Sequence, residues 1–382
     1  MTAPARIGLN LIFLVPGETG GMEIAARELI PALLAAAPPG WRFTAFINRE
    51  AAAAGGGPWG ELLPAVTVPV GARSRAQWVA GEQTLLPALA ARARVQLLHS
   101  LANTAPLWGP FRRVLTVNDL IYARYPDAHA GLRARVLGTL VPAAVRRSQR
   151  VIVISQSTRA DLLDLTHVDP ARVDVVPLGL GIRAHAAPLP PEEARARYDL
   201  GSRQVVLTLS AKRPHKNLAG LIDALAAIPA ERRPLLLLPG YPTWHEAELR
   251  ERAASAGVAG DVRFLGWVAG VELETLWSVA DAFVFPSLYE GFGLPVLEAM
   301  ARGVPVACAN ASSLPEVAGD AALLFDPHDS REIAAAIERL LCEPELADRL
   351  RARGRERALI FTWERTARMT LDSYASALHP HS

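Results

Sequence analysis

The most informative stretch of the sequence is FVFPSLYEGFGLPVLEAMARGVPVACANASSLPEVAGDAALLFDP, residues 283–327. It opens with a short apolar run, passes through a loop with Glu290 and the flexible sequence GFGL, and enters a helix near Pro295, a residue type favoured in a first helical turn. Glu298 falls on that helix, near enough to the loop for both carboxylates to reach one ligand. Carboxylates accept hydrogen bonds from hydroxyl groups, and helix N-terminal amides bind phosphates. This strand–loop–helix therefore predicts a site for a sugar, a ribose and the phosphates between them.

Outside this stretch, short apolar runs alternate with helix-length amphipathic segments along the chain. Runs of this kind, followed by turn residues, are typical of buried parallel strands; examples are RIGLNLIFLV, VQLLHS, RVIVISQS and QVVLTLS. Around residues 183–202 the pattern gives way to RAHAAPLPPEEARARYDLGS, whose proline, charge and small residues predict a linker. We therefore predict an α/β chain of two Rossmann-like, doubly wound parallel-sheet domains, 1–184 and 185–359, facing a cleft, with ligands beyond the carboxyl ends of the strands.

Composition supports two globular domains and excludes several other classes. With 382 residues and 51% hydrophobic content, the chain can bury two cores. The 40 basic and 38 acidic residues give a formal net charge of +2, so no global field favours nucleic acid. Cys308 and Cys342 lie far apart without metal-like spacing, which predicts a reducing cytoplasm and no disulfide framework. No apolar run is long enough to cross a bilayer, and the N-terminal run is interpreted as a first strand.

Segment 130–150, AGLRARVLGTLVPAAVRRSQR, carries five arginines and no acidic residue. On a helix these arginines would form a basic amphipathic surface, which could touch anionic lipid at the inner face of a membrane or a phosphorylated acceptor. The alternative is an ordinary solvated helix whose arginine stems cover the core.

The only two lysines of the chain, Lys212 and Lys216, stand four residues apart in LSAKRPHKNLAG, residues 209–220. This segment follows a predicted strand and opens a helix near Asn217, so ammonium groups beside helix N-terminal amides would neutralise a diphosphate. An ammonium is a more compact cation than the guanidinium used everywhere else in the chain.

A second strand-to-helix loop, PGETGG, lies near the N-terminus. Gly20 and Gly21 would let the backbone approach a phosphate at the start of the next helix. The alternative is a turn that only requires positive φ. The loop lacks the spacing of the dinucleotide-binding glycine fingerprint.

PSLYEGFGLPVLEAMARGVPV together with SSLPEVAGDAALLFDP resembles the signature of retaining glycosyltransferases of family 4, whose fold is called GT-B. The resemblance continues through HKNLAGLIDAL, VRFLGWV, LWSVADAFVFPS, VIVISQSTRADLL, VVPLGL and FTWERTA, and so covers nearly the whole chain. It implies that residues 360–382 form a last helix that packs back on the N-terminal domain. It also implies a nucleotide-sugar donor held mainly by the C-terminal domain and an acceptor held mainly by the N-terminal one.

The resemblance implies roles for the candidates in the C-terminal domain. Glu290 would lie beside the donor sugar, Glu298 would bind the ribose hydroxyls, and Lys216 would stabilise the departing diphosphate. Many relatives place an arginine at the position of Ser210, so Lys212 or Arg213 would supply that second charge here. The other donor-binding residues would be the loop on sugar and phosphates, the segment bordering the nucleobase, and the N-terminal glycines: Gly291, Phe292, Gly293, Leu294, Trp267, Val268, Gly20 and Gly21.

One segment departs from the family pattern. In VLTVNDLIYARYPD, relatives commonly carry a histidine followed by aspartate, near the anomeric carbon and the acceptor, where this chain has Asn118 and Asp119. An amide cannot act as a base at neutral pH, but it can hydrogen-bond a sugar hydroxyl. In a front-face substitution the departing phosphate takes the acceptor's proton, so we expect Asn118 to position a hydroxyl. His99 is predicted to be a core residue at a strand end rather than a base.

We therefore predict a retaining, metal-independent glycosyltransferase that moves a hexose, in the first place mannose from GDP-mannose, to a hydroxyl of a saccharide or lipid-linked saccharide. No cofactor is implied, because the nucleotide sugar is itself the substrate, and no Asp-x-Asp triplet or His/Cys/Asp cluster with ligand spacing predicts a metal. Polysaccharide or glycolipid assembly in the cytoplasm, with peripheral contact to the membrane, fits these features. Two other classes stay open: a nucleotide-sugar epimerase, and a nucleotide-sugar-binding partner without transferase activity, which Asn118 keeps in consideration.

Overall fold

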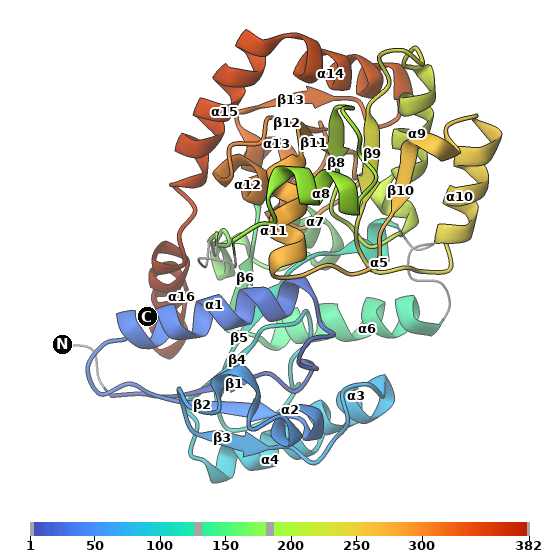
Figure 1. Cartoon of the computed structure of the whole chain (residues 1–382). Coiled ribbons are helices and arrows are strands. Elements are labelled where there is room, and N and C mark those ends of the chain that lie inside the picture. The colour runs from blue at the N-terminus through green and yellow to red at the C-terminus, as the bar shows by residue number, and fades with distance from the viewer. Residues whose placement is uncertain (1–3, 126–131, 181–186, 380–382) are drawn as a thin grey trace. The chain divides into compact units, whose positions relative to one another are not determined.

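A computed structural model describes residues 4–125, 132–180 and 187–379, which form two units built on one parallel sheet each (Figure 1). The predicted domain boundary between residues 184 and 185 falls in 181–186, outside the described residues. The parallel pairing of all neighbouring strands confirms the predicted doubly wound α/β class. None of the helices in the described ranges combines the length and apolar character that a membrane span requires.

The first unit contains a seven-stranded sheet in the order β3-β2-β1-β4-β5-β6-β7. Its strands are β1 (Arg6–Asn10), β2 (Arg42–Ile47), β3 (Ala65–Thr67), β4 (Leu97–Ser100), β5 (Arg112–Val117), β6 (Arg150–Val153) and β7 (Val173–Val175). Its helices are α1 (Gly21–Ala36), α2 (Arg49–Ala53), α3 (Arg75–Gln83), α4 (Leu85–Arg92), α5 (Ile121–Arg124), α6 (Leu132–Arg147), α7 (Gln156–Thr166) and α16 (Trp363–Leu378).

The second unit contains a six-stranded sheet in the order β10-β9-β8-β11-β12-β13. Its strands are β8 (Val205–Leu207), β9 (Leu235–Leu238), β10 (Val262–Phe264), β11 (Ala282–Phe285), β12 (Val306–Ala309) and β13 (Ala322–Phe325). Its helices are α8 (Pro191–Arg197), the short 3-10 helix η4 (Pro214–Lys216), α9 (Leu218–Ala227), α10 (Glu246–Ser255), α11 (Val271–Val279), α12 (Leu294–Ala301), α13 (Leu314–Ala318), α14 (Ser330–Cys342) and α15 (Pro344–Ala358).

Strand order in the second sheet locates its binding edge. β8 lies between β9 and β11, so the chain winds one way from β8 to β10 and the other way from β11 to β13. In open α/β sheets, ligands bind beyond the carboxyl ends of the two strands where this reversal occurs. The loops that follow β8 and β11 carry Lys216 and Glu290 respectively, so both residues belong to this switch point.

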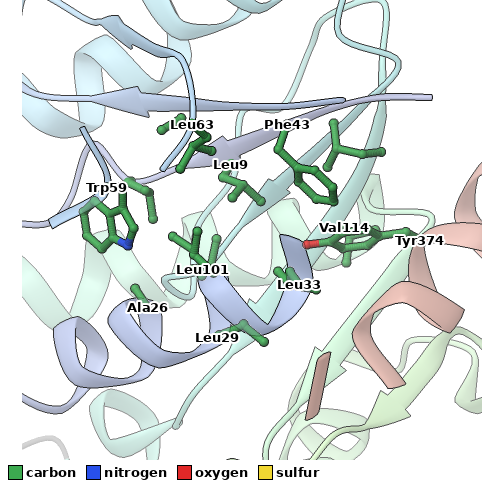
Figure 2. Close-up of a cluster of buried hydrophobic side chains, with 14 of the residues drawn as sticks. Leu9, Ala26, Leu29, Leu33, Phe43, Trp59, Leu63, Leu101, Val114 and Tyr374 are labelled. Carbon is green, nitrogen blue, oxygen red and sulfur yellow. The ribbon is translucent and has the colours of Figure 1, made fainter. Parts of the chain in front are cut away.

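The last helix, α16, belongs to the first unit. Its Tyr374 is fully buried in a cluster with residues of the sheet and of α1, among them Leu9, Leu33 and Phe43 (Figure 2). The entry to the helix is fixed by backbone contact, because Leu180 N donates to Phe361 O at 2.9 Å. Gly179 permits this approach, since a Cβ there would lie 2.4 Å from Trp363 N. The chain therefore returns to its N-terminal unit, as the family resemblance implies.

The predicted basic segment 130–150 forms α6 from Leu132 to Arg147, with Pro142 inside the helix. Residues 130 and 131 lie outside the described residues. The membrane contact suggested for this segment stays a prediction.

Candidate active site

The loop before α12 is held in a fixed shape by two serines. Glu290 N donates to Ser312 Oγ at 2.9 Å, and Ser313 Oγ donates to Glu290 O at 3.0 Å and to Phe292 O at 2.7 Å. Gly293 ends the loop with φ +115°, a left-handed conformation in which a Cβ would lie 2.7 Å from a Leu314 methyl group, so glycine is required there. The sequence did not single out these serines, although both lie within the stretch that it did.

Lys216 and Glu290 meet at the switch point. Lys216 Nζ donates to Glu290 Oε1 at 2.6 Å, and the two side chains are only 17% and 12% exposed. The ammonium also lies 5.7 Å from the centre of the Phe285 ring. The next residue, Asn217, adopts φ +53°, and its Nδ2 donates to Pro327 O at 2.7 Å, which fixes the turn into α9. A largely buried cation and carboxylate, in contact and beside the α12 loop, suit an anionic, hydroxyl-bearing ligand.

Glu298 lies one turn into α12 and is surrounded by charged neighbours. Burial raises the pKa of its carboxyl group, Arg302 lowers it and Glu274 raises it further. Arg302 itself is engaged with Glu274 through two hydrogen bonds of 2.7 and 3.1 Å. A ligand hydroxyl that donates to this carboxylate would offset the part of its desolvation that Arg302 does not.

The structure places Lys212 differently from the expected diphosphate contact. Its side chain is fully buried, and Nζ donates to Gly240 O at 2.5 Å and to Leu265 O at 2.7 Å. Burial lowers the pKa of this ammonium to about 8. Lys212 therefore joins two loops of the protein instead of presenting a free charge, because the loop directs its side chain inward. Arg213 is half-buried and stays the candidate for the second charge.

Trp267 lies in the loop after β10 and stacks on Tyr241 from the loop after β9. The ring centres are 4.4 Å apart and the planes differ by 15°. Trp267 is 50% exposed, and the neighbouring Val268 is half-buried. Sequence reasoning missed Tyr241, because nothing local shows that its loop meets that of Trp267.

In the first unit, Asn118 follows β5 and is held by its neighbours. Asn118 Nδ2 donates to Leu101 O at 2.9 Å, and its backbone N–H donates to Asn103 Oδ1 at 2.7 Å. Asn103 Nδ2 in turn donates to the Asp119 carbonyl at 3.1 Å, and Asp119 Oδ1 accepts from Ile121 N at 3.2 Å. This network orients the amide so that Asn118 Oδ1 is the atom suited to accept from a hydroxyl. Asn103, which adopts φ +43°, was not predicted.

His99 is confirmed as a core residue. It is 1% exposed, with Nδ1 at 2.6 Å from the Tyr374 hydroxyl and Nε2 at 2.7 Å from Thr116 Oγ1. Burial lowers its pKa to about 3. The imidazole therefore joins α16 to the sheet in its neutral form.

The N-terminal glycines begin α1. Gly20 is the residue before the helix and adopts φ +68°, whereas a Cβ on Gly21 would meet open space. The positive φ of Gly20 is the conformation that a turn of this kind requires, and a phosphate contact of the two glycines stays a prediction.

Within the described ranges, no group of three or more His, Cys, Asp or Glu residues is arranged to hold a metal ion.

Two doubly wound units, one with a lysine–glutamate pair at its switch point, fit the GT-B class of glycosyltransferases. Residues 19–182 match the family described as Glycosyltransferase Family 4, and residues 192–357 match Glycosyl transferases group 1. The chain belongs to this family, the group 1 glycosyltransferases.

Two curated relatives and one solved structure illustrate the similarity. O-antigen chain mannosyltransferase B of Escherichia coli is 33% identical over 69% of this chain and 70% of its own length. D-inositol 3-phosphate glycosyltransferase of Salinispora tropica is 32% identical over 96% of this chain and 83% of its own length. The structure of Anabaena Alr3699/HepE in complex with UDP-glucose matches with a TM-score of 0.77 at 20% identity, over 97% of this chain and 100% of that one. The last of these supports the fold alone.

Proposed function

We propose that this glycosyltransferase moves mannose from GDP-mannose to a hydroxyl of a saccharide or lipid-linked saccharide, with retention of the anomeric configuration, in polysaccharide assembly. The similarity to O-antigen chain mannosyltransferase B supports mannose and a growing polysaccharide. The acceptor is less well defined than the donor, because the chain is also similar to a D-inositol 3-phosphate glycosyltransferase, whose name indicates a different acceptor.

The observation that carries the proposal is the Lys216–Glu290 pair of 2.6 Å at the switch point. A bound diphosphate would take hydrogen bonds from the Lys216 ammonium and from the amides of residues 291–294. Glu290 would then accept from hydroxyls of the donor sugar, and Glu298 from the ribose. Negative charge grows on the diphosphate as its bond to the sugar breaks, so a preorganised cation there stabilises the transition state more than the ground state.

The acceptor step needs no protein base in this proposal. The acceptor oxygen bonds to the anomeric carbon on the face that the diphosphate leaves, and the acceptor's proton passes to a departing phosphate oxygen. Asn118 Oδ1 would hold the acceptor hydroxyl by accepting a hydrogen bond. Protein groups would neutralise the diphosphate, so no divalent ion takes part.

Thermal unfolding with GDP, UDP, ADP and dTDP tests the donor class, since a ligand stabilises the folded state according to its affinity. We expect GDP to give the largest rise in melting temperature. The donor chosen in this way is then offered with saccharide and extracted lipid-linked acceptors, and the anomeric configuration of the product is read by NMR. A larger shift with another nucleotide would correct the base, and the absence of any shift would contradict the proposal.

Asn118 favours one second candidate, a nucleotide-sugar-binding partner without transfer. Its signature would be a melting shift with a nucleotide sugar and no glycosylated product with any acceptor. Membership of the transferase family counts against an epimerase.

A further inference from the structure

The two lysines of the chain, four residues apart, are used in opposite ways. Lys216 meets a carboxylate at the switch point, whereas Lys212 is fully buried among backbone carbonyls. A buried ammonium is costly unless it is hydrogen-bonded, so the two carbonyl contacts of Lys212 are a built feature of the fold. Their positions in the chain show what Lys212 controls.

The two carbonyls that accept from Lys212 belong to the loops that carry the stacked aromatic rings. Gly240 directly precedes Tyr241, and Leu265 lies two residues before Trp267. Backbone bonds tie the same three segments together: Lys212 N donates to Tyr241 O at 3.2 Å, and Gly240 N donates to Gly266 O at 2.9 Å. One ammonium therefore fixes both halves of the Tyr241–Trp267 stack.

Close packing also holds the β9 loop against the Lys212 loop. Gly240 adopts φ +133°, and a Cβ on it would lie 2.0 Å from Ser210 O, so the backbone of the β9 loop passes directly against the Lys212 loop. Thr243 Oγ1 also donates to Lys212 O. Trp267 is covered by Tyr241 on one ring face and remains 50% exposed, which leaves aromatic surface for a ligand.

We propose that Lys212 is a positioning residue whose ammonium aligns the Tyr241–Trp267 stack as a platform for the nucleobase of the donor. This inference rests on the proposed function, because it requires a nucleotide-sugar donor. Every base has a flat face that stacks on an aromatic ring, so the platform contributes to nucleotide affinity whatever the base. Lys212 thus acts on the nucleoside end of the donor and Lys216 on its phosphate end.

The test separates the two ends of the ligand. The nucleoside diphosphate with the largest melting shift and its phosphate-free nucleoside are titrated into wild-type protein, Lys212→Met, Lys216→Met and Trp267→Ala, by calorimetry and ligand-observed NMR. We expect Lys212→Met and Trp267→Ala to weaken both ligands by the same factor, about 5- to 100-fold, the range for loss of one base stack. Lys216→Met, the matched control, should weaken the diphosphate and leave nucleoside binding as in wild type.

The double variant Lys212→Met/Trp267→Ala should bind no more weakly than Trp267→Ala alone, since both changes remove the same platform. A purely structural lysine would lower the melting temperature and leave the affinity of the folded protein unchanged, which would overturn the inference. So would a loss confined to the diphosphate, or additive losses in the double variant. If Lys212→Met does not fold, Trp267→Ala can still overturn the inference, because a nucleobase platform requires that this change weakens both ligands equally.

Ligand binding by the wild-type protein distinguishes a failure of the proposed function from a failure of this inference. Wild-type protein that binds no nucleoside diphosphate overturns that function and this inference with it. Wild-type protein that binds the diphosphate without detectable nucleoside binding overturns only the platform.

Discussion

Lys216 Nζ lies 2.6 Å from Glu290 Oε1, although the two residues are separated by 74 positions in the sequence. They meet because β8 and β11 are neighbours in the sheet and each residue lies in the loop that follows one of these strands. The pair keeps a cation in a largely buried site without an uncompensated charge. The Lys216 ammonium is therefore already held in place when a diphosphate arrives, and Glu290 can turn to hydroxyl donors of the ligand.

Lys216→Met should reduce kcat by at least about 100-fold, the scale for losing one preorganised charge on a developing anion. Arg331→Met, which removes an exposed basic side chain on α14, is the matched control and should leave turnover unchanged. Steady-state kinetics and melting temperatures of both variants give the answer. Wild-type turnover in a folded Lys216→Met protein would remove Lys216 from the mechanism.

Glu290→Gln and Glu298→Gln should differ in the kinetic constant that they change. Glu298 is expected to touch only the ribose, an interaction similar in ground and transition states, so its loss should mainly raise the donor KM, by roughly 10- to 100-fold. Glu290 lies beside the reacting sugar in the proposal, so its loss should mainly lower kcat, by roughly 100-fold. The reverse pattern in donor saturation curves would show that the two roles have been exchanged.

The contrast between the lysines shows how far the sequence predicts this site. Short apolar runs predict the parallel strands, and the 283–327 stretch predicts the Glu290 loop and α12, because those signals are local. The partners of Lys212, Gly240 and Leu265, come from other loops, and only the strand order brings them together. Local pattern therefore identified both lysines as special but could not show which one faces the core.

The same distinction between local and non-local signals explains which features of the first unit could be predicted. His99 was predicted to be buried because it ends an apolar run, and that prediction is confirmed. Its partner Tyr374 depends on the return of α16, and Asn103, which holds Asn118, depends on a left-handed turn that no residue pattern announces. Contacts that depend on a non-local approach were the ones missed.

Activity should survive EDTA. The proposal assigns neutralisation of the diphosphate to Lys216 and to backbone amides, so a divalent ion has no role in the transition state. The measurement is product formation by metal-depleted enzyme, with and without added magnesium or manganese. A strict requirement for either ion would contradict the proposed chemistry.

His99 should make the first unit sensitive to acid. Its pKa falls from 6.5 to about 3 on folding, so its contribution to stability is fully present above pH 6.5 and is lost as the pH falls toward 3, because the unfolded chain binds the proton first. At pH 5 the loss is about 2 kcal/mol, since each pKa unit corresponds to about 1.4 kcal/mol.

Glu82 acts in the opposite direction, so the His99 effect must be isolated. Burial raises the Glu82 pKa from 4.5 to about 7, and its contribution therefore grows as the pH falls from 7 to 4.5. Denaturant unfolding of wild type and His99→Gln at pH 7.5 and pH 5 cancels the Glu82 contribution in the difference. From pH 7.5 to pH 5, the free energy of unfolding of the variant should rise by about 2 kcal/mol relative to that of wild type. An equal change in both proteins would show that His99 titrates with an ordinary pKa.

Asn118 decides between transfer and silent binding, because this residue departs from the family pattern. If Asn118 Oδ1 only positions the acceptor hydroxyl, wild-type protein transfers sugar, and Asn118→Ala reduces transfer by less than Lys216→Met does. A general base typically contributes about 10²–10⁴-fold, so catalysis without one persists while the leaving group is stabilised. Asn118→His should remain active and hydrolyse more donor, since an imidazole can activate water.

The measurement is mass-detected transfer from the best-binding donor to extracted lipid-linked acceptors, for wild type and both variants. Melting temperatures are the folding control, because Asn118→Ala also removes the hydrogen bond to Leu101 O. Nucleotide-sugar binding without transfer in wild type, together with transfer that appears in Asn118→His, would instead establish a silenced binding partner.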